Sequence, residues 1–122
     1  MAQILLVGRD WRARALLRAQ LIEEGFDVEA HEDVSEALDS LHSTLPLPVL
    51  VLADVSANDD PAGDVKQLST WATRVPIWII AGRSFTSEKS LQSPGIEKVL
   101  FRPVDLGALV EQIKHRLRQG AP

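Results

Sequence analysis

The chain has 122 residues, of which 45% are hydrophobic and 25% are charged, and this composition fits one globular domain with its own core. The net charge of −4 argues against nucleic acid or an anionic membrane as a partner, and no apolar run approaches the roughly 20 residues of a membrane-spanning helix. The lack of cysteine excludes disulfides and thiol catalysis, and we expect a cytoplasmic protein because no leader pattern opens the chain.

The first half of the chain predicts two strands and two helices in alternation. A short apolar run at residues 4–7 predicts a buried strand, and residues 11–24 carry apolar side chains at helical spacing. Residues 26–30 alternate between apolar and polar side chains, which indicates a second strand. A capping-box pattern then favours a helix over residues 33–43.

The second half continues this alternation. Strands are predicted at residues 49–53, 77–81 and 97–101, and helices at residues 64–73, 83–93 and 106–117. The helix at 83–93 is the weakest prediction, because this segment is polar and rich in serine. Apolar strands that alternate with helices are typical of a parallel sheet covered on both faces. We therefore predict an α/β fold with a single domain over residues 1–119 and a short tail at 120–122.

In parallel sheets of this class, functional groups lie just beyond the carboxyl ends of the strands, where the strand order reverses. The residues at these strand ends are Gly8, Arg9 and Asp10 after the first strand, Asp54 after the third, Ala81 after the fourth, and Arg102 and Pro103 after the fifth. This set contains only two carboxylates, and a glycine and an arginine follow the first strand directly.

The ordered set of strand ends resembles the receiver domain of bacterial response regulators. The resemblance rests on LPVLVLADVS, VPIWIIAG and GIEKVLFRPV, and it extends over nearly the whole chain. It implies a CheY-like, flavodoxin-like (βα)5 sandwich of three layers, with a five-stranded parallel sheet in the order 2-1-3-4-5.

In this family an acidic pair after the first strand helps to hold Mg²⁺, and an aspartate after the third strand takes the phosphoryl group. Asp54 matches the phosphoacceptor, whereas Gly8 and Arg9 occupy the positions of the acidic pair. We therefore expect the Arg9 guanidinium to lie near Asp54 in the space of the metal, and no cofactor to be bound. Asp10 is the nearest remaining metal ligand, although a helix N-cap is the expected role for this residue.

The other two family positions are also altered. Ala81 stands where the resemblance implies a hydroxyl group, and Arg102 stands where it implies a lysine. Arginine keeps the positive charge but contacts oxygens with a different geometry. We expect it to pair with Asp54. Pro103 matches the family, in which the peptide bond before this proline is often cis.

The resemblance implies a signalling module of a two-component phosphorelay, and the altered positions favour a pseudo-receiver. Such a module is not an enzyme. It acts through contacts with a protein such as a histidine kinase or a signalling output protein, with a homodimer as one option, and without Mg²⁺-dependent phosphorylation.

Two alternatives stay open. One is a conventional receiver that a histidine kinase phosphorylates on Asp54 with the help of Mg²⁺. The other, more remote, is a small flavodoxin-like enzyme or nucleotide binder. That alternative requires a phosphate-cradling loop after the first strand, and GRDWRAR supplies one glycine and no serine or threonine.

Overall fold

The computed structural model describes residues 3–43, 45–82 and 94–119. Its elements, in chain order, are β1 (Gln3–Gly8), α1 (Trp11–Glu23), β2 (Asp27–His31), α2 (Val34–Ser43), β3 (Leu50–Asp54), α3 (Pro61–Ser69), β4 (Ile77–Ala81), β5 (Lys98–Phe101) and α4 (Leu106–Gln119). The predicted helix at 83–93 and the predicted tail at 120–122 lie outside the described residues. Among the described helices, none has the length and apolar character that crossing a membrane requires.

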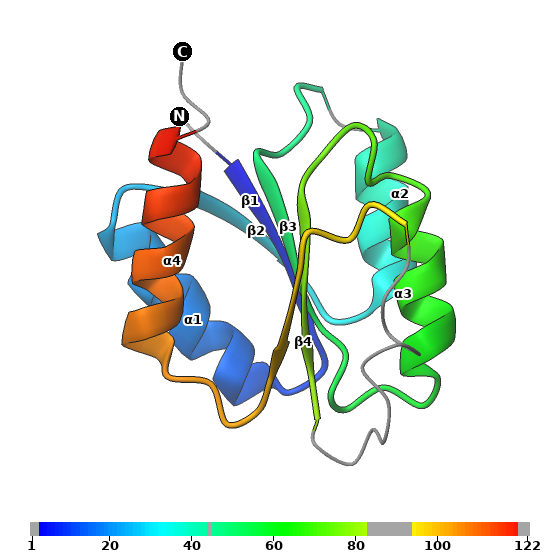
Figure 1. Cartoon of the computed structure of the whole chain (residues 1–122), viewed down its shortest axis with the longest axis horizontal. Coiled ribbons are helices and arrows are strands. Elements are labelled where there is room, and N and C mark those ends of the chain that lie inside the picture. The colour runs from blue at the N-terminus through cyan, green and yellow to red at the C-terminus, as the bar shows by residue number, and fades with distance from the viewer. Residues whose placement is uncertain (1–2, 44, 83–93, 120–122) are drawn as a thin grey trace.

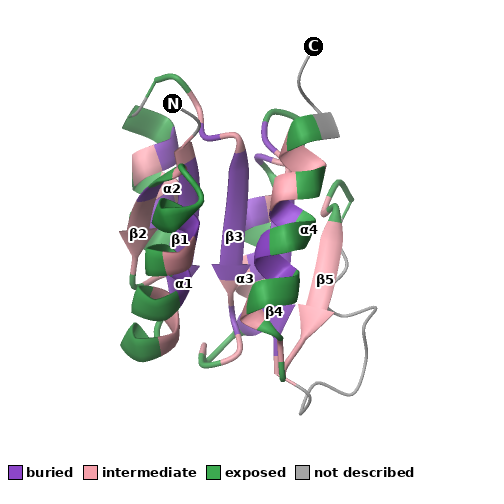
Figure 2. Cartoon of the chain, turned by 90° about the vertical axis from the view of Figure 1, so that its left-hand side faces the viewer, coloured by how far each residue is buried: buried purple, intermediate pink, exposed green. Residues whose placement is uncertain are grey.

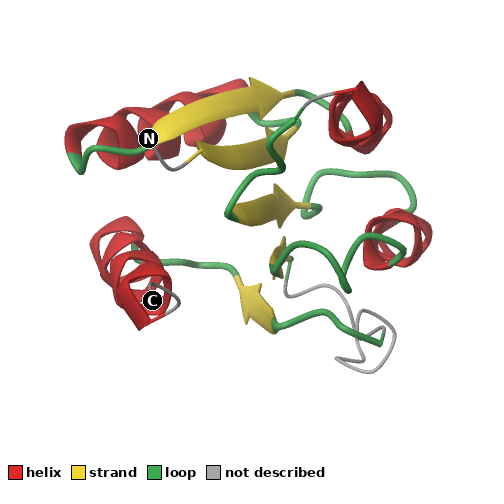
Figure 3. Ribbon diagram, turned by 90° about the horizontal axis from the view of Figure 1, so that it is seen from above, coloured by secondary structure: helices red, strands yellow, loops and turns green. Residues whose placement is uncertain are grey.

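The five strands form one parallel sheet in the order β2-β1-β3-β4-β5. This result confirms the predicted α/β class and the predicted strand order. Helices α1 and α4 cover one face of the sheet, and α2 and α3 cover the other (Figures 1 and 3). The three layers of the flavodoxin-like sandwich are therefore present in the described part of the chain.

The core divides into two halves because successive strand residues point to opposite faces of the sheet. Leu5 and Val7 of β1 pack toward α2 and α3 in one cluster of buried side chains. Ile4 and Leu6 pack with the buried side chains of α1 and α4 in a second cluster. Full burial of a leucine or isoleucine side chain contributes about 1.5–3 kcal/mol, so the strand interiors fix the sheet and its register.

Aspartate side chains cap the start of all four described helices, and Asp33 caps α2 by accepting from the Glu36 N–H at 2.9 Å. Asp10 accepts hydrogen bonds from the backbone N–H groups at the start of α1, and Asp105 accepts one from the start of α4. The Asp10 cap is as predicted. The predicted start of α3 at residue 64 was wrong, because Asp60 caps the helix by accepting from the Gly63 N–H at 3.1 Å and Pro61 opens it.

A polar cluster joins β5 to α4 at the edge of the sheet. Glu97 accepts two hydrogen bonds from Arg116, at 2.9 and 2.8 Å, and one at 2.6 Å from the indole N–H of the buried Trp78. The hydrogen bond from Arg116 is the main reason that the pKa of Glu97 lies below its ordinary value. This cluster ties the C-terminal part of α4 to the start of β5.

Candidate functional site

The register of the sheet gathers the predicted site residues at one edge. Gly8 at the end of β1 lies opposite Asp54 at the end of β3, and the backbone N–H of Arg102 donates to the Ala81 carbonyl at 2.8 Å. Strand order reverses between β1 and β3, since β2 lies on one side of β1 and β3 on the other. The site therefore occupies the crevice where an open parallel sheet binds its ligands.

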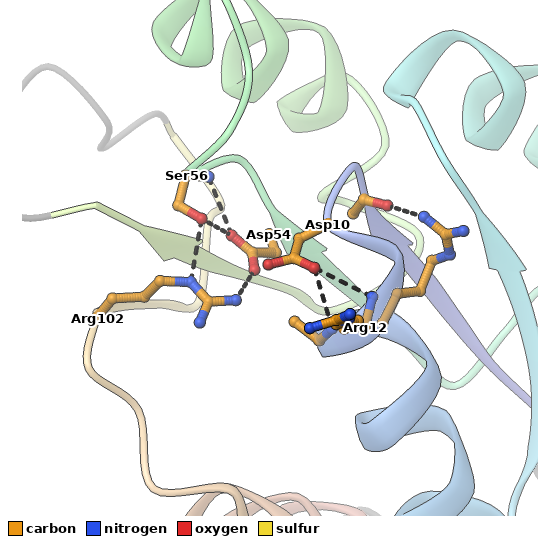
Figure 4. A network of polar contacts seen from close by, with 8 residues as sticks. Asp10, Arg12, Asp54, Ser56 and Arg102 are labelled. Atoms are coloured by element: carbon orange, nitrogen blue, oxygen red, sulfur yellow. Dashed lines mark hydrogen bonds and ion pairs between the residues drawn. The ribbon is translucent and has the colours of Figure 1, made fainter.

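Asp54 is held by donors on both of its carboxylate oxygens (Figure 4). Its Oδ1 accepts from the backbone N–H of Ser56 at 3.0 Å and from the Ser56 hydroxyl at 2.6 Å. Its Oδ2 accepts from Nη2 of Arg102. Only 12% of the Asp54 side chain is exposed, so these contacts replace most of the water that would otherwise solvate the charge.

Arg102 reaches this carboxylate from the loop between β5 and α4. Its Nε also donates to the Ser56 hydroxyl oxygen at 3.1 Å, so one guanidinium contacts both Asp54 and Ser56. The peptide bond between Arg102 and Pro103 is cis, as the resemblance implied. The contact between Nη2 of Arg102 and Oδ2 of Asp54 confirms the expected pairing of these two residues.

Arg9 does not approach Asp54, and this expectation was wrong. Its guanidinium forms an ion pair with Asp59, with 3.9 Å between Nη1 and Oδ2, and 47% of the Arg9 side chain is exposed. The physical reason is that Arg102 and Ser56 already supply the donors that the two Asp54 oxygens require. Arg9, the second cation that we expected beside Asp54, is instead half exposed and paired with Asp59.

Asp10 serves as the N-cap of α1. Its Oδ1 accepts from the backbone N–H groups of Arg12 at 3.1 Å and Ala13 at 3.3 Å. One turn further along α1, Nη1 of Arg14 donates to the Gly8 carbonyl at the end of β1. This contact was not predicted, and it adds a cation beside the positions of the family's acidic pair.

A cavity of about 210 Å³ opens beside these side chains. Its polar lining comes from Asp10, Arg14, Asp54 and Arg102, and the remainder is largely apolar surface of β1, β4, α1 and the start of α4. Two carboxylates and two guanidinium groups thus share one small cavity, and both guanidinium groups hydrogen-bond to oxygens of the protein.

Comparisons with known proteins agree with this architecture. The chain is 31% identical over 121 residues to the response regulator MprA of Mycobacterium avium, a match that covers 98% of this chain and 53% of that protein. A receiver domain from Methanospirillum hungatei has a TM-score of 0.82 at 20% identity, over 98% of this chain and 95% of that one. A two-component response regulator from Clostridium difficile has the same TM-score and identity over the full length of both chains. The chain is a CheY-like receiver domain.

No family model matches the sequence of this receiver domain. The chain spans about half the length of the curated relatives that it matches. The solved structures cited above are only 20% identical to this chain, so they show its fold and not the chemistry of its site.

The hydroxyl group at the site of this receiver domain comes from a residue that sequence reasoning missed. Ala81, at the family's hydroxyl position, is fully buried and offers no polar group. Ser56 instead brings a hydroxyl to Asp54 from two residues further along the chain. The Asp-x-Ser pattern could have revealed it, because an aspartate often accepts from the backbone N–H of the second residue after it.

The side chains around Asp54 do not fit Mg²⁺, the cation that the family implies. A magnesium ion requires an octahedral shell of oxygens, with carboxylates and waters as the usual ligands. Here one oxygen of Asp54 is bonded to a guanidinium, and Asp10 is engaged as a helix cap. Among the residues that the structure describes, no group of three or more acidic, histidine or cysteine side chains could hold a metal.

Proposed function

We propose that this receiver domain is a signalling module that acts through contacts with proteins and is not phosphorylated by the Mg²⁺-dependent route. The observation that carries the proposal is the double engagement of Asp54, by Arg102 on one oxygen and by Ser56 on the other. A histidine kinase or a signalling output protein of the cytoplasm is the partner that we infer.

The engaged carboxylate is a poor nucleophile for phosphoryl transfer. To attack a phosphoryl group, an oxygen of Asp54 must present a lone pair in line with the leaving group, while a cation neutralises the charge of the donor. Arg102 and Ser56 instead stabilise the ground state of the carboxylate. An incoming phosphoryl group would have to displace these donors before it could react.

The same contacts offer a way to signal without phosphorylation. The Asp54–Arg102 pair joins the end of β3 to the loop between β5 and α4. Receiver activation is a population shift between two surfaces of similar energy, and such a shift can be fixed by one internal contact. We infer that Arg102 holds one surface in place and that the partner binds this surface.

One observation favours the conventional alternative. Asp54 and Asp10 line the same cavity, so a rotation of Asp10 away from its cap could bring a second carboxylate toward a metal ion. A receiver phosphorylated on Asp54 with help from Asp10 is therefore the second candidate. A nucleotide binder finds less support, because only two residues separate β1 from α1 and no phosphate-cradling loop fits there.

Chemical phosphorylation separates the two candidates. The chain is incubated with acetyl phosphate and Mg²⁺, and its intact mass is measured beside that of the Asp54→Ala variant and of a sample that contains a chelator. We expect all three samples to keep the unmodified mass. A gain of one phosphoryl group that needs both Mg²⁺ and Asp54 establishes the conventional receiver instead.

A further inference from the structure

The outer side of α1 exposes more apolar surface than a helix on a sheet requires. Trp11 is 63% exposed, Leu16 53% and Ile22 43%, and these are three of the four large apolar residues that are strongly exposed in the described part of the chain. In Figure 2 the face covered by α1 and α4 is turned to the viewer, and exposed residues follow the outside of both helices. Isolated apolar residues on a surface are ordinary. Leu16 lies about 140° around the helix from Trp11 and lines the site cavity, but Trp11 and Ile22 share one side of α1, and two exposed apolar residues on one side of a helix indicate a contact.

Four of the exposed residues lie on one side of the helix. Trp11 and Ile22 are three turns apart on nearly one line, at 3.6 residues per turn, and Ala15 and Ala19 lie between them, roughly 30° and 70° to one side of that line. All four are exposed. We call them the α1 stripe. The two small alanines at its centre would let a second helix approach closely, with the larger side chains packed at either end.

The charges on α1 run against the helix dipole. Arg12 lies in the first turn and Glu23 in the last, and the helix has no acidic residue in its first turn and no basic residue in its last. A helix alone is stabilised by the opposite arrangement. By contrast, α4 carries Arg116 and Arg118 in its last turn, as the dipole favours. No ion pair within the described residues includes Arg12 or Glu23.

We propose that α1 packs antiparallel against α1 of a second copy of this chain, through the α1 stripe. In that arrangement Trp11 of one copy meets Ile22 of the other, and the alanines meet at the two-fold axis. Arg12 and Glu23 are also three turns apart, on one flank of the stripe. Because equivalent flanks meet in an antiparallel helix pair, each Arg12 lies beside the Glu23 of the other copy.

The charge pattern favours a second copy over a different protein. A face that carried only arginines would fit an acidic partner, but this helix presents both signs at opposite ends and so complements itself. The two helix dipoles would oppose each other, and each Arg12 would lie near the negative end of the partner helix. Arg18 is exposed near the centre of α1 on the other flank, so it would approach Arg18 of the second copy. The repulsion between these two like charges keeps the association weak.

Sedimentation equilibrium of the 122-residue chain over a concentration series tests the proposal. We expect a monomer–dimer equilibrium with a dissociation constant on the order of 0.1 mM, as suits an interface of one helix pair. Arg12→Glu and Glu23→Arg should each weaken the dimer roughly tenfold, because each places two like charges at both contacts of the pair.

Mixing these two variants gives the decisive result. Each variant alone repels its own copy, but a heterodimer of Arg12→Glu with Glu23→Arg has opposite charges at both contacts and should associate as tightly as the unmodified chain. Lys66→Glu and Glu32→Arg, which make the same charge changes at exposed positions outside α1, should leave the dimer unchanged. A chain that stays monomeric throughout the series, a dimer that ignores both α1 variants, or a mixture that fails to associate would each overturn the proposal.

Discussion

Replacement of Arg102 and Asp54 by alanine, singly and together, measures how strongly the two side chains are coupled. The single Arg102→Ala variant removes more than this pair, because Arg102 also donates to Ser56. The double-mutant cycle cancels the contacts that each residue makes elsewhere, and the remaining coupling energy belongs to the pair. We expect that energy to favour the folded state.

The magnitude follows from the contact and from its exposure. A hydrogen bond to a charged group contributes about 1.5–3 kcal/mol when it is protected from water. The Asp54 side chain is 12% exposed, but 39% of Arg102 is exposed, so solvent screens part of the attraction. We therefore expect a coupling energy of about 1–2 kcal/mol. In urea, the midpoint shifts of the two single variants should therefore add up to about 1 M more than the shift of the double variant.

Urea unfolding followed by tryptophan fluorescence gives the four free energies of the cycle. The matched control is the exposed pair of Arg9 with Asp59, whose atoms are 3.9 Å apart and whose side chains are 47% and 97% exposed. Its own cycle should give a coupling below about 0.3 kcal/mol. A coupling between Arg102 and Asp54 as small as that of the control would refute the view that this pair organises the site.

Three further outcomes follow from other contacts. Asp10→Ala should lower the free energy of unfolding by about 1 kcal/mol in urea melts, because α1 loses its N-cap. The hydrogen bond from Arg116 lowers the pKa of Glu97 in the folded chain. The ionised Glu97 therefore stabilises the fold at pH values above the ordinary carboxyl pKa. This stabilisation is lost as the pH falls through the lower pKa of the folded state. Glu97→Gln should therefore be less stable by about 1 kcal/mol at neutral pH and lose less stability on acidification, measured by urea melts at several pH values. The double substitution Gly8→Asp with Arg9→Asp should create saturable Mg²⁺ binding in calorimetry, since a side chain at residue 8 meets Asp54 Cβ only at an ordinary 3.5 Å.

The sheet could be predicted from the sequence because its signals are redundant. Continuous apolar runs at 49–53 and 77–81 can be buried on both faces only between helices, and the resemblance then supplied the strand order. Helix ends were less certain. The start of α3 depended on Asp60, which looks like an ordinary loop residue until its side chain is seen to cap the helix.

The site was predicted in its positions and only partly in its contacts. The strand ends placed Asp54 and Arg102 together, because the carboxyl ends of parallel strands share one edge. The sequence could not show where the long Arg9 side chain points, because several rotatable bonds separate its charge from the backbone. Ser56 was missed because Asp54 was interpreted from the family positions alone and not as the start of an Asp-x-Ser turn, in which the N–H two residues further on donates to the carboxylate.

Paramagnetic Mn²⁺, a substitute for Mg²⁺, reports whether a divalent ion binds beside Asp54. Two-dimensional amide spectra of the unmodified chain are recorded as the ion is added to millimolar concentration, with Asp54→Ala as the control. We predict no saturable broadening centred on the ends of β1 and β3, because Arg102 and Ser56 already hold the Asp54 carboxylate. Saturable broadening around Asp54 and Asp10 that disappears in the alanine variant would contradict this account.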